Sequence, residues 1–231
     1  MFLFRTSFFI KSFPRRVLRL LRHILLDNLG VEQSFKLKLI KYLPGIGFLL
    51  MDVFAIPELY DYFTNVLKQS SRYLTEEEKS CAEPIFGSII PLDEVRLDSR
   101  ARIGPSQLKV VYVSFFTINS HGAYGFSTFI HELVHVWQYM TFGSIYILHA
   151  LIAQRSLLGY NYGGLAALHK AKAQNKGLLY FNFEQQADIV RDYFLIINGY
   201  RPQWSDASIE DVALYEYFIE DLERGFWSTD F

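Results

Sequence analysis

The sequence lacks most of the features that define special classes of protein. Its single cysteine, Cys81, excludes an internal disulfide and a cysteine-rich structural zinc site, and we expect this thiol to be buried and unreactive. No run of about 18 residues is both apolar and uncharged, so we expect no helix that spans a membrane. Internal repeats and low-complexity segments are also absent. These absences favour a globular chain with an ordinary hydrophobic core.

The chain also carries little net charge. Lys and Arg number 23 and Asp and Glu number 24, so the bulk charge does not favour nucleic acid as a partner, and we expect none. Hydrophobic residues make up 51% of the chain and aromatic residues 17%, which excludes intrinsic disorder and allows a large core. With 231 residues the chain is long enough for one good-sized domain, or for one domain with an appended module.

The charge is unevenly placed along the chain. Residues 1–50 hold nine Lys or Arg and two acidic residues, whereas the remainder holds fourteen and twenty-two. Arg5 and Lys11 interrupt the first apolar residues and no small-residue cleavage site follows, so we expect no cleaved signal peptide. Two interpretations of the basic end stay open. Residues 1–30 dock on an anionic membrane surface or a partner, or they pack on the domain as a helix with solvated arginines.

The N-terminal region is predicted to be helical. Its apolar periodicity predicts a basic amphipathic helix over 14–28 and further helices over 32–43 and 46–68. We therefore divide the chain into a basic, hydrophobic helical region, residues 1–70, and a second domain, residues 71–231.

A short pattern near the middle of the chain indicates a metal-binding site. His131-Glu132-x-x-His135 lies in an apolar segment, Phe129–Trp137, that reads as a helix. Residues four apart lie on one face of a helix, so the two imidazoles can hold a single zinc ion. Glu132 would lie beside the water at the open position of a catalytic zinc site, where it can take a proton. The alternative is a core helix with two structural histidines.

A second stretch offers a third ligand. Glu184 lies 49 residues after His135, on a predicted helix that opens with the capping pair Asn182 and Gln185. Glu184 and Asp188 share a face of this helix because they are four apart. Glu184 can complete the site, and Asp188 can accept the free ring N–H of a ligating histidine. The alternative, two carboxylates on a solvated face, is disfavoured by the apolar neighbours. Together the two motifs predict one bound zinc ion.

The other predicted elements surround these two helices. Thr75 and Glu78 form a capping box that opens a short helix. Two strands are expected, over 93–100 and 109–118, the second largely buried. The remaining expected features are an N-cap for the zinc helix at Ser127 or Thr128, a helix stop at Asn198 and Gly199, and helices over 144–156, 165–174 and 208–224, the last with an apolar stripe of Ile209, Val212, Tyr215, Ile219 and Leu222.

The pairing of the two motifs resembles the gluzincin branch of the zinc peptidases. The segments FSTFIHELVHVWQY and FNFEQQADIVRDYF are similar, more closely, to small metallopeptidase domains found with bacterial Vgr and Rhs proteins, including the C-terminal effector domain of some type VI secretion spike proteins. The likeness covers residues 74–200 and leaves the first 70 unmatched. It implies an α+β, mostly helical, zincin-like fold, in which a small mixed sheet packs on the zinc helix and a second helix carries the third ligand.

The resemblance also implies roles and partners. His131, His135 and Glu184 would be the zinc ligands, Glu132 the general base, and Asp188 the partner of a ligating histidine. The protein would be a zinc metallopeptidase and a bacterial toxin or effector, with a protein or peptide substrate and with a secretion spike or an immunity protein as further partners. It would be made in the bacterial cytoplasm without a cleavable signal and exported to a target cell or its periplasm.

Loops beside the zinc helix offer groups that could stabilise an oxyanion. Tyr160 and Tyr162 are favoured over Tyr124 and His121, and simple packing is the alternative for each. The strand expected over 109–118 would lie along the cleft and bind substrate as an added strand.

Two rival functions stay open. A zinc-dependent hydrolase of peptidoglycan amides would use the same ligands, so the sequence does not separate it from a peptidase. A non-enzymatic membrane-binding or partner-binding protein would hold zinc as a structural ion, with residues 1–70 as its binding region. A structural zinc site usually has four protein ligands, whereas a catalytic site keeps one position for water.

Overall fold

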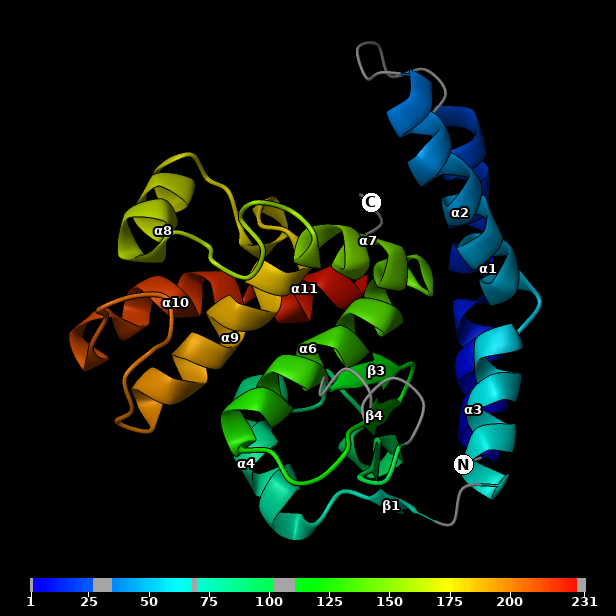
Figure 1. Ribbon diagram of the computed structural model, residues 1–231, viewed down its shortest axis with the longest axis horizontal. Helices are drawn as coiled ribbons and strands as arrows, with labels where there is room; N and C mark the ends of the chain where they lie inside the picture. Colours follow the sequence, from blue (N-terminus) through cyan, green and yellow to red (C-terminus); the bar gives the residue numbers. More distant parts are fainter. Residues whose placement is uncertain (1, 27–34, 68–69, 102–110, 228–231) are drawn as a thin grey trace.

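The computed structural model describes residues 2–26, 35–67, 70–101 and 111–227 (Figure 1). Helices dominate and four short strands form one mixed sheet, which confirms the expected α+β class. The α-helices are α1 (Phe2–Leu26), α2 (Phe35–Val53), α3 (Ile56–Leu67), α4 (Glu76–Phe86), α6 (Phe126–Phe142), α7 (Ile145–Gln154), α8 (Gly164–Ala173), α9 (Phe183–Ile197), α10 (Val212–Ile219) and α11 (Asp221–Trp227). The strands are β1 (Ser71–Tyr73), β2 (Arg96–Asp98), β3 (Tyr112–Ser114) and β4 (Thr117–Asn119), and 3-10 turns cover Leu92–Glu94, Leu178–Tyr180 and Ile209–Asp211.

The sheet has the strand order β1-β2-β4-β3. The central strands β2 and β4 are parallel, with Leu97 opposite Ile118, and β1 and β3 each add an antiparallel strand at an edge. Helix α6 packs against β3 and β4 on one side and against α9 on the other (Figure 1). The histidine motif on α6 therefore lies between the sheet and the helix that carries Glu184.

Helix α6 forms the centre of the core. All of its residues from Phe129 to Met140 are buried. A helix that is apolar around its circumference is stable only in an interior, which explains its place in the fold. The indole N–H of Trp137 donates to the carbonyl of Leu222 at 2.9 Å and ties α11 to α6. The polar residues of the motif are thus enclosed by apolar packing.

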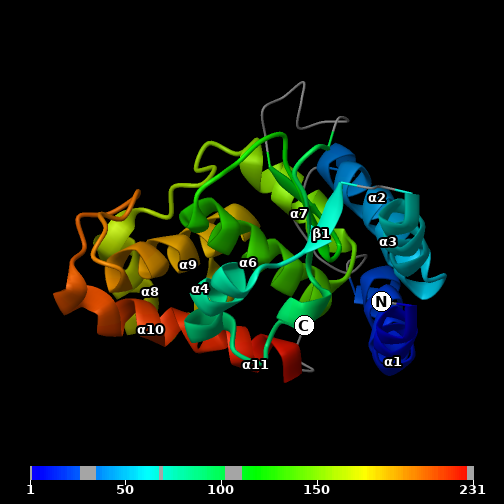
Figure 2. The ribbon, with the colours of Figure 1, turned by 90° about the horizontal axis from the view of Figure 1, so that it is seen from below.

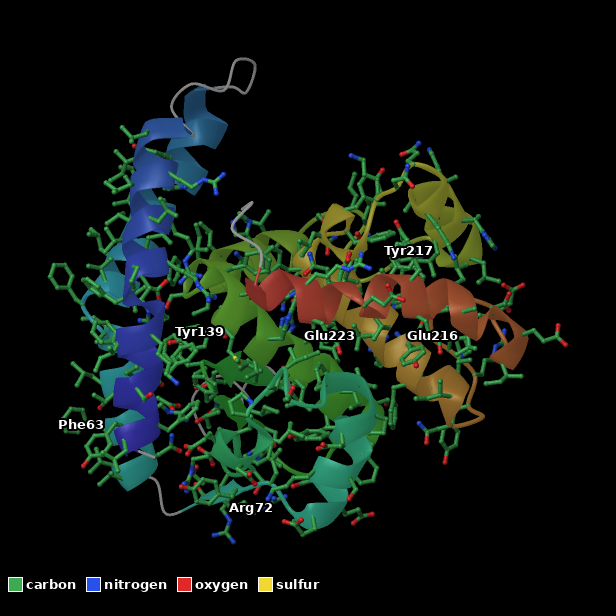
Figure 3. The ribbon with its side chains drawn as sticks, turned by 180° about the vertical axis from the view of Figure 1, so that it is seen from behind. Phe63, Arg72, Tyr139, Glu216, Tyr217 and Glu223 are labelled. Atoms are coloured by element: carbon green, nitrogen blue, oxygen red, sulfur yellow. The ribbon has the colours of Figure 1, made fainter. Side chains whose placement is uncertain are left out.

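Helices α1, α2 and α3 pack on one another and form a layer along one side of the molecule (Figures 1 and 2). Polar contacts join this layer to the rest of the chain. The hydroxyl of Tyr139 on α6 donates to Glu58 Oε1 at 3.1 Å, and the backbone N–H of Ser144 donates to Asp52 Oδ2 at 2.9 Å (Tyr139 is labelled in Figure 3). The proposed division at residue 70 stays a prediction.

The first helix is longer than predicted. It begins at Phe2 rather than at residue 14, and it continues through Pro14. Proline removes one backbone N–H from the helix, but the preceding turns are held by packing: the rings of Phe4 and Phe8 meet the ring of Phe116 edge to face, with centroids 5.5 and 5.3 Å apart. Tertiary contacts therefore extend the helix beyond the proline that the sequence suggested as its start.

The break between the next two helices also lies elsewhere. Helix α2 runs through Pro44, and the chain turns at Ala55, which has a φ of 56°, so the helices predicted over 32–43 and 46–68 are divided differently. Residues 27–34, where two predicted helix ends fall, lie outside the described residues. Among the described residues no single helix is long and apolar enough to cross a bilayer, but Tyr42–Val53 and α3, bent by 68°, meet that test as a pair.

The stretch predicted as one strand over 109–118 is a hairpin in its described part, residues 111–118. Strands β3 and β4 pair antiparallel across the two-residue turn Phe115–Phe116, and Phe115 has a φ of 61°. Both phenylalanines are buried and their rings pack against Tyr139. The aromatic residues that indicated a continuous strand instead fill the core from a tight turn.

Two further boundaries are corrected. The strand predicted over 93–100 is confined to β2, and a 3-10 turn precedes it. The helix predicted over 208–224 is divided into a 3-10 turn, α10 and α11. Ile209 lies in that turn and is exposed rather than part of an apolar stripe, because Ser208 caps the turn and directs it over the surface.

Local signals were more reliable. The capping boxes at Thr75 and Asn182 are present with their expected partners, and α9 ends at Asn198 as predicted. Cys81 is half-buried, and burial raises the pKa of its thiol to about 11, which agrees with an unreactive side chain.

Candidate metal centre

Three side chains from two packed helices converge in the core. His131 and His135 lie one turn apart on α6, and Glu184 lies in the first turn of α9. One ligand atom from each lies within 4.8 Å of the other two, and all three side chains are buried. The packing of α6 on α9 therefore brings together the three residues that the sequence predicted as ligands.

The hydrogen bonds of Gln138 fix the tautomer of His135. The side-chain amide of Gln138 donates to the carbonyl of Phe183 at 2.8 Å, and a carbonyl can only accept. The amide oxygen of Gln138 therefore faces His135 Nδ1, at 2.7 Å, and Nδ1 must carry the proton. His135 Nε2 is left with a lone pair, and it lies 3.6 Å from Glu184 Oε2.

Asp188 fixes the tautomer of His131 in the same way. Its Oδ1 atom accepts from His131 Nδ1 at 2.6 Å. Its Oδ2 atom accepts from Arg191 Nη2 at 2.9 Å and from the indole N–H of Trp204, so the carboxylate is held from both sides. With its proton on Nδ1, His131 presents the lone pair of Nε2, and this atom lies 3.2 Å from Glu184 Oε2.

When both histidines are neutral, Glu184 Oε2 thus faces two ring nitrogens that have no hydrogen to offer it. Gln154 donates to the other carboxylate oxygen, Oε1, at 2.8 Å and keeps the group oriented. Two lone pairs and a carboxylate need a cation between them. Zinc ligands in a tetrahedral site are about 3.3 Å from one another, and the two nitrogen–oxygen separations here, 3.2 and 3.6 Å, are of that size. His131, His135 and Glu184 therefore fit a zinc ion.

In the metal-free chain, protons take the place of the cation. Burial lowers the pKa of His131, but its hydrogen bonds to Asp188 and Glu184 outweigh burial and raise the pKa to about 10. The pKa of His135 is also raised, because the charge of Glu184 outweighs burial. Burial would raise the pKa of Glu184, yet the two histidines hold it well below its usual range. The site therefore attracts positive charge.

Glu132 lies beside this group without belonging to it. Its side chain is buried, and its Oε2 atom has no hydrogen-bond partner among the described residues. Burial raises its pKa against the opposite influence of the two histidines. A buried carboxyl oxygen without a partner is uncommon in folded proteins and points to a bound ligand, a bound water or a catalytic role. A raised carboxyl pKa suits proton transfer near neutral pH.

The two favoured tyrosines have different surroundings. The ring of Tyr160 lies beside His131, with centroids 5.9 Å apart, and is partly exposed. Tyr162 is buried, and its hydroxyl donates to Asp192 Oδ2 at 2.7 Å and pairs with the hydroxyl of Tyr215 at 2.7 Å. Tyr160 therefore lies next to a ligand, whereas the hydroxyl of Tyr162 is engaged in a separate buried network.

Of the two less favoured groups, Tyr124 lies nearer the site. Its hydroxyl is buried without a hydrogen-bond partner among the described residues, and burial together with the charge of Glu132 raises its pKa. His121 instead forms an antiparallel bridge with Arg100 at the side of the sheet.

The sequence analysis missed four residues that orient the ligands. Gln138 follows His135 by three positions and Arg191 follows Asp188 by three, so each had a local signal in its helical spacing. Gln154 and Trp204 reach the site from distant parts of the chain, where no local pattern marks them.

The N-cap predicted for the histidine helix is wrong. Gly125, in extended conformation, is the N-cap of α6, and no side chain caps the helix. Ser127 and Thr128, the predicted caps, lie inside the first turn, where the backbone is already helical and the capping position has passed.

Comparison with known proteins finds a partial relative. The type VI secretion system spike protein VgrG2b of Pseudomonas aeruginosa (strain PAO1) is 32% identical to the chain over 146 residues. The match takes in 57% of this chain and 14% of that protein, so the chain spans a small part of its relative. No family model matches the chain, and no solved structure matches it. The predicted likeness to bacterial Vgr proteins is confirmed to this extent.

Proposed function

We propose that the chain is a zinc-dependent hydrolase that cleaves peptide bonds. The observation that carries this proposal is the meeting of two imidazole lone pairs and a carboxylate oxygen beside the buried, unpartnered carboxyl group of Glu132. Among the described residues the ligand group has three members, His131, His135 and Glu184. Three ligands favour a catalytic ion over a structural one, which usually has four.

The surrounding residues are suited to the chemistry. When bound, zinc supplies a Lewis acid that polarises a carbonyl and lowers the pKa of water. Glu132 takes the proton of the attacking water and returns it to the leaving nitrogen, a role that its raised pKa favours. Asp188 and Gln138 hold the two histidines with their Nε2 atoms toward Glu184.

Tyr160 is our choice for the group that steadies the developing oxyanion. Its ring lies beside His131, it is partly exposed, and burial together with the charges of Glu184 and Asp188 keeps its pKa above the ordinary value, so the hydroxyl stays a donor. Tyr162 has no part in the proposed mechanism, because its hydroxyl is engaged with Asp192.

Strand β3 is our choice for the place where a peptide substrate lies. It forms one edge of the sheet, and α6 packs against it. An extended peptide can add to an edge strand as a further strand, although in β3 the carbonyl of Val113 already accepts the hydroxyl of Tyr146 at 2.7 Å. This places the hairpin, rather than one continuous strand over 109–118, in the substrate-binding role.

The partial relative supports a setting for this activity. VgrG2b is a type VI secretion spike protein, and its match to this chain covers 57% of this chain and 14% of VgrG2b. We propose that this chain is an effector that associates with a secretion spike and is exported to a target cell or its periplasm, where an immunity protein would oppose it.

The test is the variant Glu132→Gln, with Glu216→Gln as a control on the exposed surface of α10 (Glu216 is labelled in Figure 3). Glu132→Gln should retain zinc, measured by elemental analysis, and lose hydrolysis of a denatured protein by at least about 100-fold, the scale of general base catalysis. Glu216→Gln should keep both. Full activity of Glu132→Gln would remove Glu132 from the mechanism. Release of peptides from purified cell wall, with no cleavage of denatured protein, would favour the peptidoglycan hydrolase instead.

A further inference from the structure

Helix α3 has its polar face buried and its apolar face exposed. Its buried residues are Pro57, Glu58, Asp61 and Asn65, which recur at helical spacing. Most of its large apolar residues lie on the other side and are exposed, namely Ile56, Leu59, Tyr60, Phe63, Val66 and Leu67, whereas Tyr62 is half-buried. A surface helix of a water-soluble protein shows the reverse arrangement. Phe63 points away from the rest of the molecule at its outer edge (Figure 3).

Ion pairs and hydrogen bonds hold the helix in this orientation. Arg5 Nη2 lies 2.6 Å from Asp61 Oδ2, and the hydroxyl of Thr117 on β4 donates to Asp61 Oδ1 at 2.8 Å. Arg16 binds both carboxylate oxygens of Glu58, one at 3.1 Å. Rotating α3 to bury its apolar face would break these contacts and leave buried charges without partners, which is strongly unfavourable. The exposed apolar face is therefore built into the fold.

The neighbouring helices are apolar outside as well. Leu3, Leu18 and Leu25 of α1 and Leu43 and Leu50 of α2 are all exposed. An exposed apolar area on this scale is uncommon for a protein that stays in water and marks an interaction surface. The bent pair of Tyr42–Val53 and α3 has the length and apolar composition of a membrane-associated segment.

The charge of the layer decides what covers it. Asp52, Glu58 and Asp61 are the acidic residues in the described part of α1, α2 and α3, and all three are buried. Lys11 and Arg15 of α1 are exposed, and they line the groove between α1 and the body of the molecule, which Glu223 of α11 also lines. The outer surface of the described layer is therefore apolar and exposes no carboxylate of its own, and exposed cations lie along one edge of it. Apolar groups flanked by basic ones fit a bilayer that carries anionic headgroups.

We propose that the layer of α1, α2 and α3 docks on the surface of an anionic lipid membrane. The apolar face of α3 enters the boundary between headgroups and acyl chains, and Lys11, at the edge of the layer, lies among the headgroups. This keeps the membrane interpretation of the basic end but changes the residues that carry it, since Arg5 and Arg16 are buried, bind Asp61 and Glu58, and are neither solvated nor available to lipid. The proposal stands apart from the proposed hydrolysis, because none of these residues belongs to the metal centre.

The test is flotation of the full chain with vesicles of phosphatidylglycerol and phosphatidylethanolamine, compared with vesicles of phosphatidylcholine. The chain should float with the anionic vesicles. The double variant Leu59→Gln/Phe63→Gln should lower the partition coefficient at least about tenfold, because it removes two large apolar groups from the bilayer. Ile209→Gln, a matched change at another exposed apolar residue, should leave it unchanged. Lys11→Gln should weaken binding up to about fivefold and reduce its salt dependence.

Three results would overturn the proposal. One is failure of the full chain to float with anionic vesicles at low salt. A second is equal loss of binding in the Ile209→Gln variant, which would make the effect unspecific. The third is a stable dimer in sedimentation experiments that Leu59→Gln/Phe63→Gln dissociates while vesicles are ignored, which would assign the face to a second copy of the chain. Circular dichroism of each variant confirms that it is folded before binding is compared.

Discussion

Two of the buried polar clusters among the described residues differ in how their charges are balanced. In the α1–α3 layer, Glu58 meets the guanidinium of Arg16; burial lowers the pKa of Arg16, but the hydrogen bond to Glu58 raises it above the ordinary value. Between α6 and α9, Glu184 meets two imidazoles whose protons are directed elsewhere, to Asp188 and Gln138. The first cluster supplies its own cation and is complete. The second, with both histidines neutral, presents acceptors to one another, and protons or a metal ion from outside would complete it.

This difference separates a structural cluster from a binding site without reference to any relative. A buried carboxylate is stable only with a positive partner. Where the chain provides that partner, as at Glu58, the cluster fixes the orientation of a helix. Where the chain directs the available protons away, as at Glu184, the geometry is suited to a metal ion. The predictions that follow compare the two clusters, beginning with the largest expected effect.

Breaking the cluster at Glu58 should destabilise the fold and leave zinc affinity unchanged. Glu58→Ala leaves Arg16 buried without its partner and should lower the free energy of unfolding by about 3–5 kcal/mol, as for other broken buried ion pairs. Glu216→Ala, on the exposed surface, should change it by no more than about 0.5 kcal/mol. Urea denaturation measures both. Reduced zinc affinity in folded Glu58→Ala would mean that the two clusters are coupled.

Weakening the cluster at Glu184 should reduce zinc affinity rather than the stability of the fold. Asp188→Ala frees the ring of His131 and should reduce zinc affinity about 10–100-fold. Competition with a chelator measures this, with exposed Asp206→Ala as the control. Asp192 is unsuitable as a control: it accepts the backbone N–H groups of Gln203 and Trp204 at 2.8 and 3.0 Å, and Trp204 in turn donates to Asp188. Unchanged affinity in Asp188→Ala would contradict the assigned hydrogen bond.

The metal-free site should make stability depend on pH. The pKa of His131 is raised from 6.5 to about 10, so its protonated form stabilises the chelator-treated protein fully below pH 6.5. That contribution should fall steadily as pH rises from 6.5 toward 10. Zinc replaces the proton, so the zinc-bound protein should lack this decline. Urea midpoints at pH 6.5 and 9, with zinc and with chelator, measure the difference. An equal shift of the urea midpoint with pH in the zinc-bound and the chelator-treated protein would mean that a group other than His131 takes up the proton.

The convergence of His131, His135 and Glu184 could be predicted from the sequence because its signals are local. The spacing of His131 and His135 needs only a helix, and the cap at Asn182 fixes where the Glu184 helix begins. Asp188 follows Glu184 by one turn on that helix. Helical geometry alone therefore places these groups on the correct faces, although the contact between α6 and α9 had to be assumed.

The errors arose where distant contacts decide the outcome. Phe115 and Phe116 resemble strand residues, but packing against Tyr139 places them in a turn. The sequence predicts a helix over residues that include α3, yet that prediction does not say which face is buried. That choice depends on Arg5 and Arg16, which lie about 50 residues earlier in the chain.

The central claim is that Glu184, His131 and His135 hold one zinc ion. Calorimetric titration of zinc into the chelator-treated chain tests it most directly, with Glu184→Ala alongside. We expect one ion bound per chain, with release of protons because both histidines must be neutral to bind, and at least 100-fold weaker binding in Glu184→Ala, on the order of a lost ligand. No binding by the native chain, or equal binding in Glu184→Ala, would contradict the account.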